Sequence, residues 1–163
     1  MKQQIIILLI LFLGISSCTQ NNEFNIAEKE KSVQEIQLML EKYHYDISKK
    51  GLTAEFKYLD NSSDFFWVPP GYSSALSYDS VKTILQANAK GFTSIKFHWD
   101  TLKIYPLSKT TANYSGIVGG YMIDTAGTRS DISIIESGTF IKRKDGWKFL
   151  SGQSAMLDTK SKQ

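Results

Sequence analysis

A helical pattern of apolar side chains begins after Asn25. Asn25 and Glu28 have the spacing of a capping box, which is typical of a helix start. Apolar residues then recur at alternating steps of three and four up to Gly51, which places them on one stripe of a helix: Val33, Ile36, Leu40, Tyr43 and Ile47. The stripe lasts only about two heptads, fewer than a coiled coil needs. We therefore expect this helix to pack on a sheet.

The next forty residues predict two shorter helices and one strand. Apolar steps of four and three indicate a short helix over 52–59, and the run over 65–68 is typical of a strand. Pro69–Gly71 must end that strand, because proline has no N–H to donate to a sheet. A third helix is expected over 79–90, with Gly91 as its stop signal.

Everything after Gly91 alternates as strands do. Apolar residues occupy odd positions from Ile95 to Trp99 and even positions from Leu102 to Ile104, which predicts a bulge near Asp100. Further strands are expected over 114–122, 132–140 and 147–157, with hairpin turns at Ala126–Gly127 and Asp145–Gly146. Because helices come first and strands follow without alternation, the pattern predicts an α+β domain with a mainly antiparallel sheet.

The first eighteen residues have the pattern of an export signal. Lys2 precedes an apolar run over 5–13, and small residues over 15–17 lead into Cys18. The run is much shorter than the roughly 20 residues that span a bilayer. Its I-S-S-C end resembles the lipobox of bacterial lipoproteins, which implies cleavage before Cys18 and acylation of that residue. We therefore predict a protein that contacts a membrane through lipidated Cys18.

This interpretation divides the chain into four parts: a signal peptide over 1–17, a lipidated tether over 18–24, one folded domain over 25–158 and a polar tail over 159–163. The predicted location is the bacterial cell envelope. An outer-membrane position facing the periplasm is favoured, because Thr19 stands where an aspartate resembles a signal for inner-membrane retention.

Composition and charge exclude several classes of function. The net charge of +3, from 19 basic and 16 acidic residues, is too balanced to indicate a nucleic-acid partner. Cys18 is the only cysteine, so the chain cannot form an internal disulfide. His44 and His98 are far apart in sequence and have no recognised ligand spacing, so no metal or other cofactor is expected.

The order of elements, the segment G-T-F-I-K-R-K-D-G-W-K-F-L over 138–150 and the closing S-G-Q-S over 151–154 resemble the nuclear transport factor 2-like superfamily. The nearest branch is that of polyketide-cyclase-like (SnoaL-like) and kinase-association-domain-like proteins. The resemblance implies a cone-shaped, cystatin-like roll in which three N-terminal helices pack on a curved sheet. It also implies an interior pocket and homodimers formed through the open sheet face.

Glu136 is the polar residue that most needs an explanation. It shares strand parity with Ile132 and Ile134, so its carboxyl should point inward, where desolvation raises the pKa. An inward carboxylate of this kind serves as the base in isomerases that the resemblance includes. Tyr114 or Gln153 would then be the hydrogen-bond donor. The alternative is a purely structural hydrogen bond at the mouth of the cone.

The predicted pocket is apolar and rich in aromatic residues. Its expected lining is Trp67, Tyr72, Trp99, Tyr114, Met122, Glu136 and Gln153. Relatives that resemble this chain often carry a histidine in the last strand near the closing serine, where this sequence has Gln153 beside Ser154. His98 and Asp100 are expected on the outer face, and His44 on the surface of the first helix.

Three functions are consistent with these patterns. The leading hypothesis is a domain without catalysis that binds a small apolar ligand or an envelope protein. The second is an isomerase, cyclase or hydrolase that uses Glu136. The third is a dimerisation module with a filled interior. A cavity with Glu136 on its wall favours the first two hypotheses, whereas a filled interior favours the third.

Overall fold

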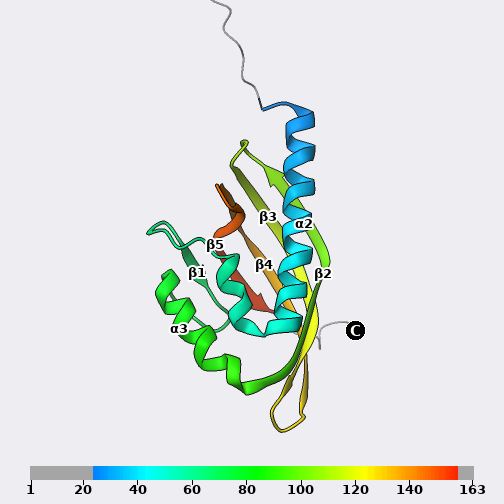
Figure 1. Ribbon diagram of the computed structural model, residues 1–163, viewed down its shortest axis with the longest axis vertical. Coiled ribbons are helices and arrows are strands. Elements are labelled where there is room, and N and C mark those ends of the chain that lie inside the picture. The colour runs from blue at the N-terminus through cyan, green and yellow to red at the C-terminus, as the bar shows by residue number, and fades with distance from the viewer. Residues whose placement is uncertain (1–23, 158–163) are drawn as a thin grey trace, which may run out of the picture.

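A long N-terminal helix lies along one face of a curved sheet in the computed structural model, which describes residues 24–157 (Figure 1). This helix, α2, spans Ile26–Lys50. The predicted capping box is present, because Asn25 Oδ1 accepts the Glu28 N–H at 3.0 Å and Glu28 Oε2 accepts the Asn25 N–H at 3.2 Å. The predicted signal peptide, Cys18, nearly all of the predicted tether and the predicted tail lie outside the described residues.

The remaining elements follow the predicted order. They are η1 (Leu52–Lys57), β1 (Phe66–Val68), α3 (Tyr78–Asn88), η2 (Ala89–Gly91), β2 (Phe92–Pro106), β3 (Thr111–Asp124), β4 (Arg129–Arg143) and β5 (Gly146–Met156). The short second helix is of the 3-10 type, and the third begins one residue early because Ser77 accepts the Ser80 N–H as its cap.

The five strands form one sheet in the order β1-β5-β4-β3-β2. All neighbours are antiparallel except β1, which runs parallel to β5. The predicted bulge is confirmed, since the register of β2 against β3 shifts between Trp99 and Thr101. Long β2 therefore keeps its apolar side chains on the helix-covered face across a bend. The fold class predicted from the sequence is confirmed.

An aromatic stack fills one end of the space between helices and sheet. The rings of Tyr114 and Phe140 stack with centroids 4.2 Å apart, and Phe149 packs edge-on against Phe140 at 4.9 Å. Within the described residues, fifteen apolar residues are buried, from Ile36 to Phe149. Residues 24–157 thus contain a complete core of their own, and we expect them to fold as an independent unit.

Two glycines make room for tryptophan side chains inside the cone. A Cβ atom at Gly116 would lie 2.9 Å from the ring of Trp99, and one at Gly152 would lie 2.5 Å from the ring of Trp67. Both distances are below van der Waals contact. The glycines therefore let the two indoles lie flat against the sheet, where they form part of the walls described below.

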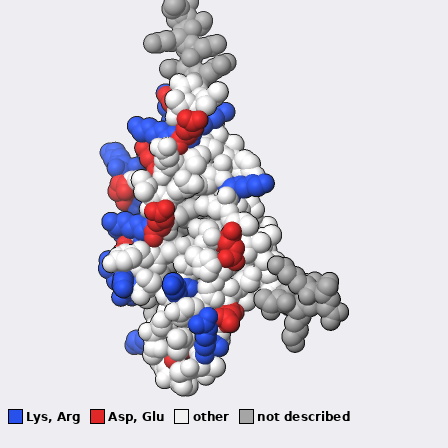
Figure 2. All heavy atoms as spheres, turned by 90° about the vertical axis from the view of Figure 1, so that its right-hand side faces the viewer, with Lys and Arg blue, Asp and Glu red and all other residues white. Residues whose placement is uncertain are grey.

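The outer face of the sheet carries few charges at its centre. Ile117, Ile135 and Ala155 form one row across β3, β4 and β5, and Ser115, Ser137 and Gln153 form the next. Figure 2 shows that charged side chains gather along one edge of the molecule while much of the opposite edge is uncharged. His98 and Asp100 lie on the outer face as predicted, with Nε2 and Oδ1 2.8 Å apart.

Candidate functional site

A cavity of about 270 Å³ opens between the helices and the inner face of the sheet. Its walls come from α2, η1 and α3 on one side and from all five strands on the other. Most of the lining is aliphatic or aromatic, including Leu52, Ile84, Met122, Trp67, Phe97 and Trp99. The cavity borders the aromatic stack, because Phe149 of that stack is part of its lining.

Apart from the two indoles, five side chains with polar groups interrupt the apolar wall: Tyr43, His44, Glu55, Glu136 and Ser154. Two of them are carboxylic acids. Among the described residues, no lysine or arginine lines the cavity. The chemistry of the site thus depends on the protonation of Glu55, Glu136 and His44.

Glu136 lies on β4 between Gly116 of β3 and Ser154 of β5, and its side chain faces the cavity. Burial raises the pKa of the Glu136 carboxyl to about 7, although a hydrogen bond from Tyr114 opposes the rise. The Tyr114 hydroxyl donates to Oε1 of Glu136 at 2.9 Å. Near neutral pH, Glu136 is therefore divided between its protonated and ionised forms.

Glu55 is a second acid in the same cavity, and sequence reasoning missed it. Burial raises the pKa of the Glu55 carboxyl to about 8; the Tyr43 hydroxyl hydrogen-bonds to it and opposes the rise, while the charge of Glu136 adds to it. Leu52 and Glu55 are three residues apart, a spacing that puts them on the same side of a 3-10 turn. Glu55 is also four residues before Leu59, so the spacing alone could have identified it, but charged residues in short segments are usually exposed.

His44 was expected on the surface, and this expectation is wrong. Its ring lies on the cavity wall, with centroids 5.9 Å from Trp99 and 6.5 Å from Phe97. Burial, with a further contribution from the charge of His98, lowers the pKa of His44 to about 4. The bent strand β2 covers a wider arc of α2 than the apolar stripe indicated. His44 is thus a neutral imidazole at physiological pH.

The two indole N–H groups differ. Trp67 Nε1 donates to Ser154 Oγ at 3.3 Å across the β1–β5 edge. Trp99 Nε1 is buried without a hydrogen-bond partner among the described residues. The Trp99 ring packs edge-on against Tyr114 at 5.9 Å, so it contacts the residue that holds Glu136.

The predicted pocket residues divide into two groups. Four lie on the wall: Trp67, Trp99, Met122 and Glu136. Tyr114 lies beneath the wall, with 2% of its surface exposed, where it donates to Glu136 and packs against Trp99. Tyr72, which is 46% exposed in the turn after β1, does not line the cavity.

Gln153 lies on the opposite face of the sheet, so its predicted place in the pocket is wrong. It is exposed and pairs with Ser137, whereas Ser154 pairs with Glu136 and faces inward. The cause is an irregularity in the β4–β5 register between Thr139 and Phe140. One extra residue in β5 after Phe149 reverses which of the following side chains face the cavity, so Gln153 points outward.

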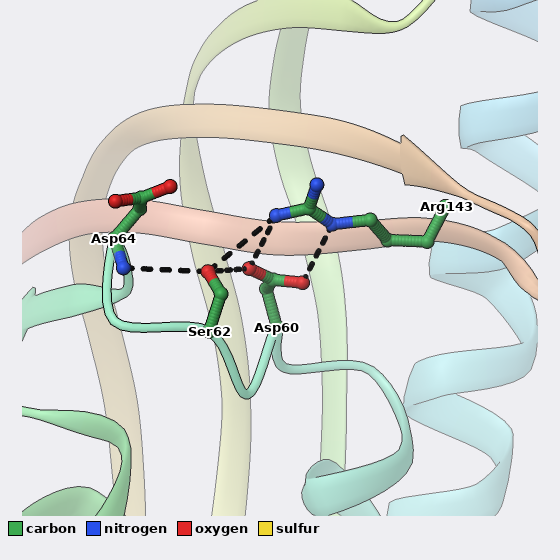
Figure 3. Close-up of polar contacts among 4 residues, drawn as sticks. All are labelled: Asp60, Ser62, Asp64 and Arg143. Carbon is green, nitrogen blue, oxygen red and sulfur yellow. Dashed lines mark hydrogen bonds and ion pairs between the residues drawn. The ribbon is translucent and has the colours of Figure 1, made fainter.

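A further buried carboxyl group, that of Asp60, lies outside the cavity. Figure 3 shows its contacts with Arg143 and Ser62. Asp60 accepts hydrogen bonds from Arg143 Nε at 2.9 Å and Arg143 Nη2 at 2.8 Å, and Ser62 Oγ donates to the same carboxylate. The Arg143 guanidinium holds the pKa of the Asp60 carboxyl below its usual range. The pair ties the loop after η1 to the end of β4, and its contacts are those of a structural ion pair.

Two searches for other kinds of site found nothing within residues 24–157. No group of three or more histidine, cysteine, aspartate and glutamate side chains has a geometry that would hold a metal ion. No helix in this part of the chain is both long and apolar enough to span a bilayer.

Solved structures resemble the whole described domain. A nuclear transport factor 2-like superfamily protein from Salmonella enterica matches with a TM-score of 0.63 and 17% identity, over 82% of this chain and 97% of that one. This chain has the nuclear transport factor 2-like fold. A scan of family models found no match to the sequence, and a search of curated proteins also found none.

Other structures with the nuclear transport factor 2-like fold have different functions. A hexachlorocyclohexane dehydrochlorinase matches with a TM-score of 0.65 and 12% identity, over 82% of this chain and 90% of the enzyme. A Xanthomonas campestris protein, named for the association domain of calcium/calmodulin-dependent protein kinase II, matches with a TM-score of 0.65 and 12% identity, over 77% and 88%. The fold thus serves both catalysis and association, and function must be argued from the site.

Proposed function

We propose that this protein is a lipid-anchored domain of the bacterial cell envelope that binds a small, largely apolar molecule inside its cone. The apolar cavity of about 270 Å³ carries the proposal. An apolar cavity of about 150 Å³ accepts benzene, so this one has room for a molecule somewhat larger. Aromatic walls and a few polar groups are typical of ligand sites.

Binding is tested with 2-phenylethanol, a neutral molecule of suitable size. The protein used is a fragment over 19–163, which lacks the predicted signal peptide and Cys18. We expect saturable binding, with chemical-shift changes in NMR spectra that are confined to residues of the cavity. No saturable binding would contradict the proposal.

Two adjacent residues of β3 provide a matched pair of variants. Met122 lines the cavity, whereas Tyr121 points to the other face of the sheet. Met122→Trp should fill the cavity and weaken 2-phenylethanol binding at least tenfold, about 1.4 kcal/mol. Tyr121→Trp should leave binding unchanged. Equal effects of the two substitutions would place the binding site elsewhere.

Lipidation of Cys18 supplies the proposed location and has its own test. Cells that express the full chain are fed an alkyne-labelled fatty acid, and the purified protein is examined for the label. We expect label on the wild type and on Ser17→Ala, but none on Cys18→Ser. An unlabelled wild type would contradict the anchor and leave the cavity proposal standing.

The paired acids favour a second candidate, a proton-transfer enzyme. The pKa of Glu136, raised to about 7, suits a general base, and Glu55, whose pKa is raised to about 8, would remain protonated as a donor. The test is deuterium exchange at the α-carbons of 2-indanone, followed by NMR. If the protein is an enzyme, exchange should be faster than in buffer alone, and Glu136→Gln should abolish this excess. Glu30→Gln, on the exposed surface of α2, should retain it.

The centre of the sheet's outer face, which carries few charges, favours self-association as a further property. Ile135 is 45% exposed at the centre of this face and pairs with Ile117 and Ala155 on the neighbouring strands. Sedimentation should show a dimer for the fragment over 19–163 and a monomer for Ile135→Lys. A monomeric wild type would contradict this part of the proposal.

A further inference from the structure

We propose that the molecule held in the cavity is an organic cation: a small apolar molecule with one protonated amine, which lies against Glu55 and Glu136. This inference rests on the proposed function, because it assumes that the cavity binds a small molecule. It adds the sign of the ligand's charge. The argument starts from how this protein treats its other carboxylates.

Elsewhere in the described domain, carboxylates that are buried or partly buried form ion pairs with lysine or arginine side chains. Asp60 pairs with Arg143, Asp46 lies 3.3 Å from Lys50 Nζ, and Glu35 accepts from Lys142. Glu55 and Glu136 have no such partner, since no lysine or arginine lines the cavity. Burying an ionised carboxylate without a counter-charge is costly. A bound cation would supply the charge that the wall lacks.

The acids also leave hydrogen-bonding capacity for a donor. Tyr114 occupies Oε1 of Glu136, and a carboxylate can accept several further hydrogen bonds. An ammonium group has three N–H donors and no acceptor, which suits two acids that line the same cavity. A ligand carboxylate or phosphate would meet two acids and no cationic side chain, and would be repelled whenever either acid is ionised.

The remaining walls are compatible with positive charge. Trp67, Phe97 and Trp99 present aromatic rings to the cavity, and ring faces attract cations. His44 would repel a cation only if it were protonated, but burial lowers its pKa to about 4. Aliphatic residues such as Leu52 and Ile84 would contact the apolar body of the ligand.

Binding of a cation should release protons at neutral pH. The titratable groups around the two acids are Tyr43 and His44 from α2 and Tyr114 from β3, with His98 of β2 acting on His44. Both tyrosines have pKa values raised well above the usual range by burial, so they stay neutral. Among the described side chains that line the cavity, only Glu55 and Glu136 change charge between pH 5 and 8, and a cation favours their ionised forms.

The experiment compares three ligands of similar shape by isothermal titration calorimetry at pH 7.5: 2-phenylethylamine, 2-phenylethanol and 3-phenylpropanoate. The protein is the fragment over 19–163. We expect the amine to bind about tenfold tighter than the alcohol, as one charge-assisted hydrogen bond would produce. The propanoate should bind more weakly than the alcohol. At pH 5, where both acids are protonated, the preference for the amine should disappear.

Variants identify the residues responsible. Glu55→Gln and Glu136→Gln should each reduce the amine's advantage over the alcohol, and the double variant should abolish it. Binding of the neutral alcohol should change less than about twofold, since glutamine preserves the shape of the wall. Glu30→Gln removes one charge from the exposed surface of α2 and should change none of the three affinities.

The outcomes separate this inference from the proposed function. Binding of the alcohol with no preference for the amine would overturn the inference and leave the proposed function in place. Tightest binding of the propanoate would also overturn it. If none of the three ligands binds, the proposed function fails and the inference with it. The pH 5 measurement on the wild type decides the matter even where a variant fails to fold.

Discussion

Asp60 and Glu136 are both acids withdrawn from bulk water, yet their surroundings are opposite. Asp60 accepts two hydrogen bonds from Arg143, and its carboxyl pKa is lowered. Glu136 faces an apolar cavity with only the Tyr114 hydroxyl bound to it, and its pKa is raised to about 7. The first arrangement is complete within the chain. The second has no cationic partner among the described residues, and we propose that a ligand in the cavity supplies one.

This contrast gives a criterion for function that the fold does not supply. A buried ion pair whose partners both belong to the protein mainly joins two segments, here the loop after η1 and the end of β4. Two acids facing a cavity without a cation cost stability and are consistent with a role in binding or proton transfer. The comparison therefore predicts opposite effects when each kind of site is altered.

The largest expected effect follows from breaking the complete pair. Arg143→Met keeps most of the side chain but leaves the 5% exposed Asp60 carboxylate without its cation. We expect Tm to fall by about 10 °C at pH 7, because a buried charge is left unpaired. The measurement is thermal unfolding followed by circular dichroism.

Arg129→Met is the control for this substitution. Arg129 pairs with Asp131 at 2.7 Å, but both side chains are more than half exposed. Its Tm should change by less than about 2 °C, since exposed pairs contribute little. Similar losses in the two variants would mean that the Asp60–Arg143 pair has no special structural role.

A smaller effect of opposite sign is expected in the cavity. The folded-state pKa of Glu55, about 8, exceeds the unfolded value of 4.5, so the folded protein binds more protons between these values and loses stability as pH rises. Glu55→Gln removes this loss. Its Tm should exceed that of the wild type by about 5 °C at pH 8, with little difference at pH 4.5. A lower Tm at pH 8 would contradict the assignment.

The smallest effect is expected at His44, with the reverse dependence on pH. Its folded-state pKa of about 4 lies below the unfolded value of 6.5, so the wild type gains stability as pH rises through this range. The difference in Tm between His44→Leu and the wild type should therefore be about 3 °C more positive at pH 5 than at pH 7.5. An equal effect at both pH values would show that His44 does not titrate as a buried group.

The sequence predicted the fold better than the site, and the two bulged regions show why. Near Asp100, apolar residues mark both sides of the parity change, so the bulge in β2 is visible in the sequence. In β5, by contrast, the residues after Leu150 are polar or glycine up to Ser154. The change of parity there therefore leaves no apolar pattern in the sequence. Gln153 was therefore assigned to the wrong face.

Glu55 and His44 were missed for different physical reasons. Glu55 lies three residues after Leu52 and four before Leu59, so its spacing is that of a buried position, but a charged residue in a short segment is usually exposed. His44 stands beside the apolar stripe of α2 and is covered only because β2 bends over it, which is a tertiary effect. Glu136 could be predicted, because strand alternation alone turns its side chain inward.

The most direct test is an NMR titration of the carboxyl carbons of Glu55, Glu136 and Asp60 in one sample of the fragment over 19–163. The structure predicts midpoints of about 8 for Glu55 and about 7 for Glu136, and a midpoint below the usual value of 3.8 for Asp60. Added 2-phenylethylamine should lower the two glutamate midpoints and leave that of Asp60 unchanged. Glutamate midpoints near 4.5, the ordinary value, would show that the cavity acids are solvated and would contradict the account.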